Sequence, residues 1–259
     1  MQKKLAIFDY HGTLVSALEN HDIAYRNTVK ELFGVEGSIH DTYFAASTNQ
    51  HVTIGIARAR GVPERLIKQK QGLILSTYEK HFIASLQKFP PKVLSGIQEL
   101  LELLVQKNFV IVLYSGDSKK TLAAILEKTG LKKYFSRELI ISASSRKRPE
   151  ADRKKLLAEA IRTAEKEFGR FSRENVFLFD DSARGVQAGK ELGIVTVAVG
   201  TGPEGTRNLR EAGPSFLFQN FRNPKRAVEK IERLQKKPRE RRKKTVFARK
   251  KPPLRRRKY

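Results

Sequence analysis

The sequence predicts an α/β fold with a doubly wound parallel sheet, and three observations support this. From about residue 90 onward, short apolar runs alternate with segments of helical periodicity, which is typical of successive βαβ units. The first apolar run, residues 5–8, ends in Asp9, and open α/β sheets present reactive groups in the loop after such a strand. Between Asp9 and Val93 the chain reads as helices, so we expect a helical domain inserted after the first strand.

The strands and helices of the expected core follow one another in order. A helical stripe formed by Ile97, Leu100, Leu101 and Leu104 precedes the second strand. One later helix covers about residues 121–128 and ends before Gly130, and another covers residues 153–168. The further strands are expected at residues 109–114, 139–141, 176–179, 194–199 and 216–218.

The expected insertion shows helical rather than strand spacing of its apolar residues. Ile23, Tyr25, Val29, Leu32 and Phe33 share one helical face, and a looser stripe runs through residues 66–82. We therefore divide the chain into an α/β core (residues 1–14 and 90–232), a helical insertion (15–89) and a C-terminal tail (233–259).

The tail is distinguished by its charge. Lys and Arg outnumber Asp and Glu by 52 to 27 in the 259 residues, a formal net charge of +25. Fifteen of these cations lie in residues 233–259, where Glu240 is the single acidic residue and three prolines interrupt the run. Such a segment cannot offset its ordering entropy by burial, so we expect a disordered tail when free. Its charge predicts RNA or DNA binding without sequence preference.

Composition excludes several classes of protein. The absence of cysteine rules out a disulfide framework and a thiolate-ligated metal site. No apolar stretch approaches the ~20 residues of a membrane span, and the apolar run before Asp9 is too short for a signal peptide. We expect a soluble, cytoplasmic protein.

Three further segments carry polar residues at or after expected strands. They are residues 110–117, ending Tyr-Ser-Gly-Asp; the basic stretch 146–149; and residues 176–185, containing Asp-Asp-Ser-Ala-Arg-Gly. With residues 5–14, in this order and spacing, they resemble the four signature motifs of the haloacid dehalogenase-like (HAD) hydrolases over residues 3–232. The resemblance implies a Rossmann-like core whose insertion is a cap over the active site. It is strongest to the phosphoglycolate phosphatase and β-phosphoglucomutase branch.

The resemblance implies a phosphatase that forms an aspartyl-phosphate and requires Mg²⁺. Asp9 matches the nucleophile, although a strand-end aspartate alone could equally be a metal ligand or a turn cap. The Ser115 hydroxyl and the backbone near Gly116 match the groups that hold phosphate oxygens, together with Gly12 and Thr13. The expected substrate is a small phosphorylated metabolite.

Asp180 and Asp181 are candidate metal ligands. Adjacent carboxylates in one cleft repel each other unless a cation neutralises them, and Mg²⁺ prefers such hard oxygen ligands. The resemblance adds Asp9 and the backbone carbonyl of His11 as ligands. Gly185 stands where other members have a further aspartate, so that ligand is absent.

The phosphate-clamping cation is expected in the basic stretch. Lys147 resembles the family lysine most closely, and Arg148, Lys154 and Lys155 are alternatives. In a chain this basic, a single lysine is more often a solvated surface charge.

His11 departs from the family pattern, which has an aspartate two residues after the nucleophile as general acid and base. An imidazole with pKa near ~6.5 could replace it, and nearby carboxylates should raise that pKa. Loss of the acid/base would lower the rate by ~10²–10⁴. Two alternatives therefore stay open: hydrolysis of C–X or C–P bonds, and a weakened scaffold that binds nucleic acid.

Other polar residues in the insertion carry less weight. The stretch Thr48-Asn49-Gln50-His51 resembles the place of substrate-selecting residues, but polar residues are common in a helix–helix loop. His21, His40 and His81 lack metal-ligand spacing, and we expect them at the surface or its boundary.

Overall fold

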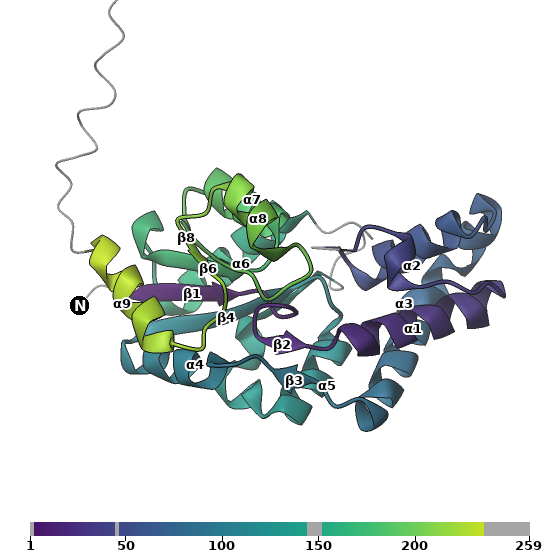
Figure 1. The fold of residues 1–259 in the computed structure, drawn as a ribbon, viewed down its shortest axis with the longest axis horizontal. Helices are drawn as coiled ribbons and strands as arrows, with labels where there is room; N and C mark the ends of the chain where they lie inside the picture. Colours follow the sequence, from purple (N-terminus) through teal and green to yellow (C-terminus); the bar gives the residue numbers. More distant parts are fainter. Residues whose placement is uncertain (1–2, 45–46, 144–151, 236–259) are drawn as a thin grey trace, which may run out of the picture.

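The structure, a computed structural model, describes residues 3–44, 47–143 and 152–235. Its centre is a six-stranded sheet in the order β5-β4-β1-β6-β7-β8, with every neighbouring pair parallel (Figure 1). The predicted α/β fold and all six predicted strands are confirmed. The strands are β1 (Lys4–Phe8), β4 (Phe109–Ser115), β5 (Ile140–Ser142), β6 (Val176–Asp180), β7 (Val195–Val199) and β8 (Phe216–Phe218).

Helices cover both faces of the sheet, as a doubly wound fold requires. Ala6 and Phe8 of β1 pack in a core with α4 (Ile97–Gln106), α5 (Lys119–Thr129) and α9 (Pro224–Gln235). Leu5 and Ile7 point to the opposite face, against α6 (Arg153–Phe168) and α7 (Ala183–Glu191). This alternation is the strand period of two. The remaining core helix, α8 (Gly205–Ala212), packs on α7.

The strand register brings three chain segments to one edge of the sheet. Phe8 of β1 pairs with Leu113 of β4 on one side and with Phe179 of β6 on the other. The residues after these positions therefore emerge together at the carboxyl edge, where open α/β sheets bind ligands.

The helices described between Ser16 and Lys92 form the insertion. These helices are α1 (Leu18–Phe33), the short 3₁₀ helix η1 (Ile39–Asp41), α2 (Asn49–Ala59) and α3 (Glu64–Lys88). They form a lobe at the carboxyl edge of the sheet (Figure 1). The chain enters and leaves this lobe through β2 (Val15–Ser16) and β3 (Lys92–Val93), which pair antiparallel. Three further 3₁₀ turns, η2 (Leu131–Tyr134), η3 (Arg137–Leu139) and η5 (Arg173–Asn175), complete the core.

Two predicted boundaries shift. Helix α2 begins at Asn49 with the Thr48 hydroxyl accepting from the His51 amide, so residues 49–51 form a first helical turn rather than a loop. Helix α9 continues to Gln235 and so includes the first three residues of the predicted tail. Residues 236–259, like the basic stretch with Lys147 and Arg148, lie outside the described part of the chain. None of the described helices is both long and apolar enough to cross a membrane.

Candidate active site

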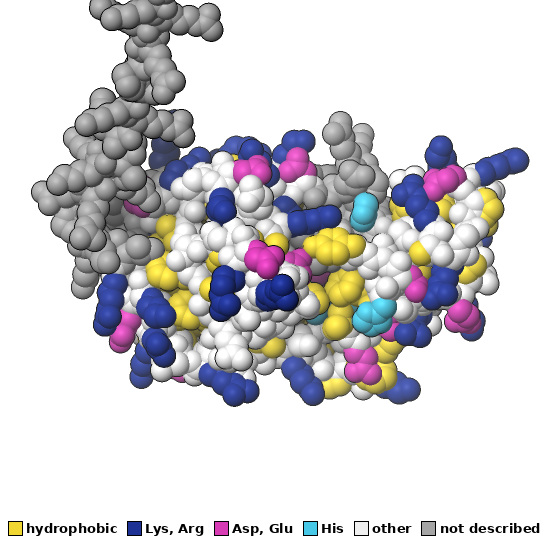
Figure 2. Space-filling model, turned by 45° about the horizontal axis from the view of Figure 1, so that its top comes forward, with side chains coloured by type: hydrophobic (Ala, Val, Ile, Leu, Met, Phe, Trp, Pro, Cys, Tyr) yellow, Lys and Arg dark blue, Asp and Glu magenta, His cyan; other side chains and the backbone are white. Residues whose placement is uncertain are grey.

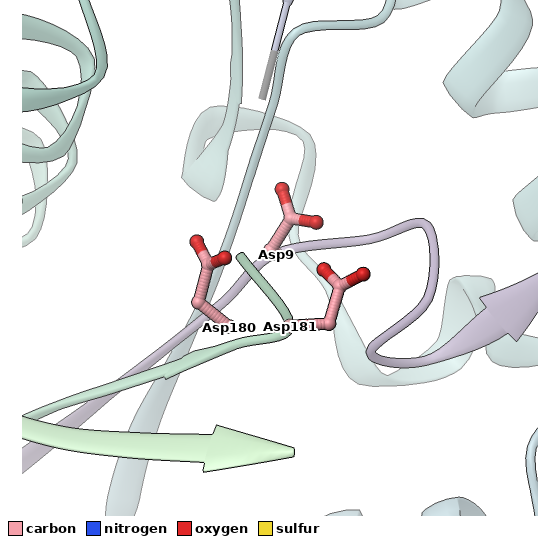
Figure 3. A group of neighbouring side chains, drawn as sticks. All are labelled: Asp9, Asp180 and Asp181. Carbon is pink, nitrogen blue, oxygen red and sulfur yellow. The ribbon is translucent and has the colours of Figure 1, made fainter. Parts of the chain in front are cut away.

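Three buried aspartates converge at the carboxyl edge of the sheet. Asp9 follows β1, Asp180 ends β6 and Asp181 is the next residue, and each offers a carboxylate oxygen within 4.8 Å of the others (Figure 3). The structure thus brings together the nucleophile and both side-chain metal ligands that the sequence indicates.

Burial dominates the electrostatics of this aspartate cluster (Asp9, Asp180 and Asp181). It raises the pKa of Asp9 to about 7, with Arg153 lowering the pKa and Asp180 raising it further. Burial, and then the charges of Asp9 and Asp180, also raise the pKa of Asp181 well above its ordinary value. Among the described residues, three carboxylates thus face the Arg153 guanidinium, and a divalent cation would relieve their repulsion. The donor set, three carboxylates, fits Mg²⁺.

Two glycines make room for this cluster. A Cβ at Gly185 would collide with the Asp180 carboxylate, and one at Gly12, whose φ is +78°, would collide with that of Asp181. Gly185 therefore has no side chain that could bind a metal ion, but it leaves space for the carboxylate of Asp180, a predicted metal ligand. The Thr13 hydroxyl donates to Asp181 Oδ1 at 3.4 Å, so the Gly-Thr pair after β1 supports the cluster directly.

Asp180 is held by Ser182, which precedes α7, and by Tyr114 of β4. Its Oδ1 accepts hydrogen bonds from the amide and hydroxyl of Ser182, at 2.8 and 2.6 Å. Its Oδ2 accepts from the Tyr114 hydroxyl. Tyr114, which sequence reasoning did not single out, is fully buried, and burial raises its pKa well above the ordinary value.

Arg153 is the cation that the structure places at the cluster, and sequence reasoning missed it. Its Nη1 donates to Asp9 Oδ1 at 2.9 Å, and its guanidinium lies 5.0 Å from the Tyr114 ring centroid. Burial alone would lower the Arg153 pKa, but the facing Asp9, Tyr114 and Asp180 raise it overall. The signal was available: Arg153 shares the buried face of α6 with Leu156, Leu157, Ala160 and Ile161.

The described alternatives for the phosphate clamp form surface ion pairs and do not line the cavity. Lys154 pairs with Glu191 at 3.0 Å and Lys155 with Asp152 at 2.9 Å, both on the surface. They occupy positions of α6 that turn away from the buried face on which Arg153 lies. Lys147 and Arg148 fall outside the described residues.

Ser115 ends β4 beside the cluster, and the insertion approaches at the next residue. Its hydroxyl accepts from the Asp117 amide at 3.1 Å and donates to Asp117 Oδ2 at 3.4 Å. A Cβ at Gly116 would collide with the carbonyl of Ser47. The lack of a side chain at Gly116 therefore allows the backbone of the insertion to lie close to the core at this position.

The expected rise in the His11 pKa is wrong. Burial and then the neighbouring His21 lower it to about 3, outweighing the opposite effects of Asp117 and the Ala17 backbone. The His11 imidazole is therefore neutral near pH 7 and is both a weak base and a poor proton donor.

His21 is the second histidine of the site, and its expected surface position is wrong. The side chain is buried on the face of α1 that also carries Tyr25 and Val29. Its ring centroid lies 4.6 Å from that of His11. Nδ1 is 2.5 Å from the Tyr78 hydroxyl, and Nε2 is 4.0 Å from Asp117 Oδ2. Burial lowers its pKa. By contrast, His40 is exposed and His81 pairs with Glu31 at the surface.

Asn49 joins the insertion to the core beside this histidine. Its side-chain nitrogen, Nδ2, donates to Asp117 Oδ1 at 2.9 Å and to the Tyr25 hydroxyl at 3.2 Å. Its side-chain oxygen, Oδ1, accepts from the backbone amide of Ser118 at 3.1 Å. Residues 48–51, which were a weak signal in the sequence, thus supply a buried residue, Asn49, at the site.

A cavity of about 310 Å³ lies between the carboxyl edge of the sheet and the insertion. Asp9, Asp181, Ser115 and Arg153 line one part of it, and residues of α1, η1 and α2 line another. A small molecule bound there would contact the aspartate cluster and the insertion together.

Comparisons with known proteins agree with this geometry. The sequence model of the haloacid dehalogenase-like hydrolases matches residues 3–193. A phosphoglycolate phosphatase from Synechococcus elongatus is 25% identical over 235 residues, covering 88% of this chain and 98% of that protein. Another, from Pseudomonas syringae pv. tomato, is 23% identical over 225 residues, covering 85% and 77%.

Solved structures share the fold. A putative β-phosphoglucomutase from Bacteroides vulgatus superposes with a TM-score of 0.70 at 22% identity, covering 91% of each chain. The β-phosphoglucomutase of Clostridium difficile has a TM-score of 0.71 at 15% identity, covering 91% of this chain and 99% of that one. At such identities the likeness establishes the fold alone.

Proposed function

Because the chain belongs to the haloacid dehalogenase-like hydrolases, we propose that it is a Mg²⁺-dependent phosphatase acting on a small phosphate monoester. The observation that carries this proposal is the buried aspartate cluster facing Arg153 at one end of a cavity. The names of the two curated relatives, both phosphoglycolate phosphatases, support the same reaction class.

In the proposed reaction Asp9 attacks the phosphorus atom and forms an acyl-phosphate, while the bond to the alcohol oxygen breaks. Water then attacks the phosphorus of this intermediate, releasing phosphate and restoring Asp9. Arg153 and the Ser115 hydroxyl bind the non-bridging oxygens, where negative charge must be neutralised. Arg153 thereby takes the role that the sequence comparison gave to Lys147.

His11 is a weak acid–base catalyst for both steps. With a pKa lowered to about 3 by burial, the imidazole is neutral near pH 7 and has little affinity for the proton of the attacking water. It is a poor proton donor to the alcohol that leaves in the first step. We therefore expect the first step to limit the turnover of alkyl phosphates.

The aspartate cluster is the proposed Mg²⁺ site. Asp9, Asp180 and Asp181 would hold the ion, with the His11 backbone carbonyl as a further ligand suggested by the family resemblance. The ion would supply positive charge to the phosphoryl group. Burial and mutual repulsion, which raise the Asp9 and Asp181 pKa values, are the physical support for a cation here.

Residues 15–89 act in this proposal as a cap over the site. Two contacts from the lobe to the core support this role. Asn49 donates to Asp117 at 2.9 Å, and the Tyr43 hydroxyl donates to Glu204 Oε1 at 2.7 Å. Both acidic partners line the cavity, so the lobe and the core enclose it jointly.

The decisive experiment is turnover of p-nitrophenyl phosphate by the full-length protein with and without Mg²⁺. We expect Mg²⁺-dependent release of p-nitrophenol that is lost in Asp9→Asn and retained in Glu174→Gln, a control at an exposed carboxylate. Absence of turnover in the wild type would contradict the proposal, and turnover of a haloacid or phosphonate instead would favour the alternative reactions.

The charge of residues 233–259 favours a second function, non-specific RNA or DNA binding. On the described surface shown in Figure 2, Lys and Arg side chains are scattered among acidic ones rather than gathered in one patch. We therefore assign polyanion binding to the tail.

A further inference from the structure

Tyr114 lies beside the aspartate cluster but does not line the cavity. Its side chain is fully buried, and the described residues that line the cavity do not include it. Tyr114, Asp9 and Asp180 each follow the paired positions of β4, β1 and β6, which are neighbouring parallel strands. Because side chains alternate along a strand, all three point to the face of the sheet that α6 covers. Tyr114 is therefore next to the proposed nucleophile without reaching the space that a substrate would occupy.

Tyr114 makes two contacts through different parts of its side chain. The hydroxyl, at the edge of the ring, donates to Asp180 Oδ2. The face of the ring lies against the Arg153 guanidinium, whose central carbon is 5.0 Å from the ring centroid. One side chain thus contacts both a proposed metal ligand and the proposed phosphate-binding cation, which belong to β6 and α6.

The hydroxyl completes the hydrogen bonding that fixes the Asp180 carboxylate. Ser182 donates two hydrogen bonds to Oδ1, at 2.8 and 2.6 Å, and Tyr114 donates to the other oxygen. Since β1 lies between β4 and β6, two interstrand spacings of ~4.8 Å each separate these strands. A long side chain with a terminal donor spans this distance. With both oxygens bonded, the carboxylate is oriented before a cation binds.

The ring sets the orientation of the Arg153 guanidinium. Nη1 donates to Asp9 Oδ1 at 2.9 Å, whereas Nε is buried and has no hydrogen-bond partner among the described residues. A hydrogen bond at Nη1 alone does not fix the plane of the group, but contact with a ring face does. The attraction between a cation and a ring face is largest where both are desolvated, and here both side chains are buried.

We propose that Tyr114 is a positioning residue that organises two parts of the active site separately: its hydroxyl orients Asp180 for cation binding, and its ring orients Arg153 for phosphate binding. The inference rests on the proposed phosphatase function, which supplies the roles of Asp180 and Arg153. If Tyr114 served core packing alone, changing it would affect the binding of both ligands to the same extent. The proposal requires instead that the two effects can be separated.

Tyr114→Phe tests the hydroxyl, because it keeps the ring. In calorimetry on the full-length protein we expect the affinity for Mg²⁺ to fall by about 10- to 100-fold, as for loss of a group that orients a metal ligand. The affinity for inorganic phosphate, measured at a Mg²⁺ concentration that saturates each variant, should change little. Tyr134→Phe is the matched control. It removes a tyrosine hydrogen bond to Glu102, at 2.8 Å on the surface of the core, and should leave both affinities unchanged.

Tyr114→Leu tests the ring. It lacks the aromatic face as well as the hydroxyl, so its affinity for inorganic phosphate should be about tenfold lower than that of Tyr114→Phe. If Tyr114→Leu does not fold, trifluorophenylalanine at this position takes its place. It keeps the shape of the ring and weakens the negative charge of its face, so the same loss of phosphate affinity is expected.

The pattern of losses decides the inference. Unchanged Mg²⁺ affinity in Tyr114→Phe, or equal losses of Mg²⁺ and phosphate affinity, would contradict the role of the hydroxyl. Equal phosphate affinity of the variants with and without the ring face would contradict the role of the ring. Absence of p-nitrophenyl phosphate turnover in a wild type that binds both ligands would contradict the proposed function and leave this inference in place. Binding of neither ligand by the wild type would contradict the inference itself.

Discussion

Arg153 Nη1 lies 2.9 Å from Asp9 Oδ1, although the two residues are 144 positions apart in the chain. The first turn of α6 and the end of β1 thus meet at the proposed nucleophile. The guanidinium lowers the Asp9 pKa against the larger effect of burial, which holds the pKa at about 7. Arg153 therefore favours the ionised form of Asp9 that attacks phosphorus.

Replacing Arg153 tests this pairing. Arg153→Met keeps much of the length of the side chain but removes its charge, and we expect kcat/KM for p-nitrophenyl phosphate to fall by about 10²–10³, as for loss of one transition-state donor. Arg153→Lys should retain part of the activity, since one donor and the charge remain. Lys154→Met, at the exposed neighbouring position, is the matched control and should have wild-type kinetics.

Mg²⁺ affinity should depend on the aspartate cluster even if turnover is slow. Asp181→Ala removes a carboxylate from the group of three and should weaken Mg²⁺ binding by more than about tenfold in calorimetry. Asp117→Asn removes a carboxylate that lines the same cavity outside the cluster, and its effect should be small. Equal affinity of the wild type and Asp181→Ala would exclude the proposed metal site.

His11→Asp should raise turnover by roughly 10–10³-fold, because a carboxylic acid could protonate the leaving alcohol while the neutral imidazole cannot. The gain should be largest for alkyl phosphates and smallest for p-nitrophenyl phosphate, whose leaving group needs little protonation. His11→Asn adds no acid and should give no gain. If His11→Asp folds and binds Mg²⁺ normally without becoming faster, proton donation does not limit the wild type.

The buried His21 should make the protein sensitive to acid. Burial lowers the His21 pKa from 6.5 in the folded state, so below pH ~6.5 the unfolded chain binds a proton that the folded protein does not. The free energy of unfolding therefore falls with decreasing pH, by up to ~1.4 kcal/mol per pH unit for this group.

Urea unfolding between pH 7 and 5 measures this effect. The difference between the wild type and His21→Phe measures the contribution of His21 together with its effect on the pKa of the neighbouring His11. We expect the wild type to lose more stability than His21→Phe on acidification. The control His40→Gln, at an exposed histidine, should follow the wild type. Parallel curves for the wild type and His21→Phe would show that His21 is protonated in the folded state.

A chain truncated after Gln235, where α9 ends, should keep its melting temperature and any phosphatase activity. Its affinity for RNA and DNA should fall sharply, because the truncation removes residues 236–259, in which Lys and Arg greatly outnumber acidic residues. For the full chain, log affinity should decrease with log salt by ~0.7–0.9 for each phosphate contacted. Unchanged affinity after truncation would locate the contact surface on the described body.

The strands and the three aspartates could be predicted because short stretches of the sequence identify them. An apolar run followed by aspartate identifies a strand end, and parallel strands bring such ends to one edge. The helical spacing places Arg153 on the apolar face of α6, but only the packing of α6 on the sheet shows that this side chain meets Asp9. His21 shows the same limit. Its place on the buried face of α1 is readable, but its contact with Asp117 depends on how the insertion packs on the core.

The His11 prediction failed for a different reason. Sequence shows the carboxylates near His11 but not how little water reaches it, and burial is the larger effect on its pKa. At Gly185 the sequence showed only that a further ligand is absent, whereas the structure shows that its lack of a side chain makes room for Asp180.

The pairing of β2 with β3 has a consequence for how such a protein can change. Val15 and Ser16 lie opposite Val93 and Lys92, and the Leu94 amide donates to the Leu14 carbonyl at 2.9 Å. The two ends of the insertion are thus adjacent and fixed by the core. A lobe of another length closes the same short gap, and doubling a loop's length costs only ~0.6 kcal/mol of closure entropy. Recombination at this one junction could therefore exchange the whole lobe as a cassette, giving a new substrate pocket on an unchanged catalytic sheet.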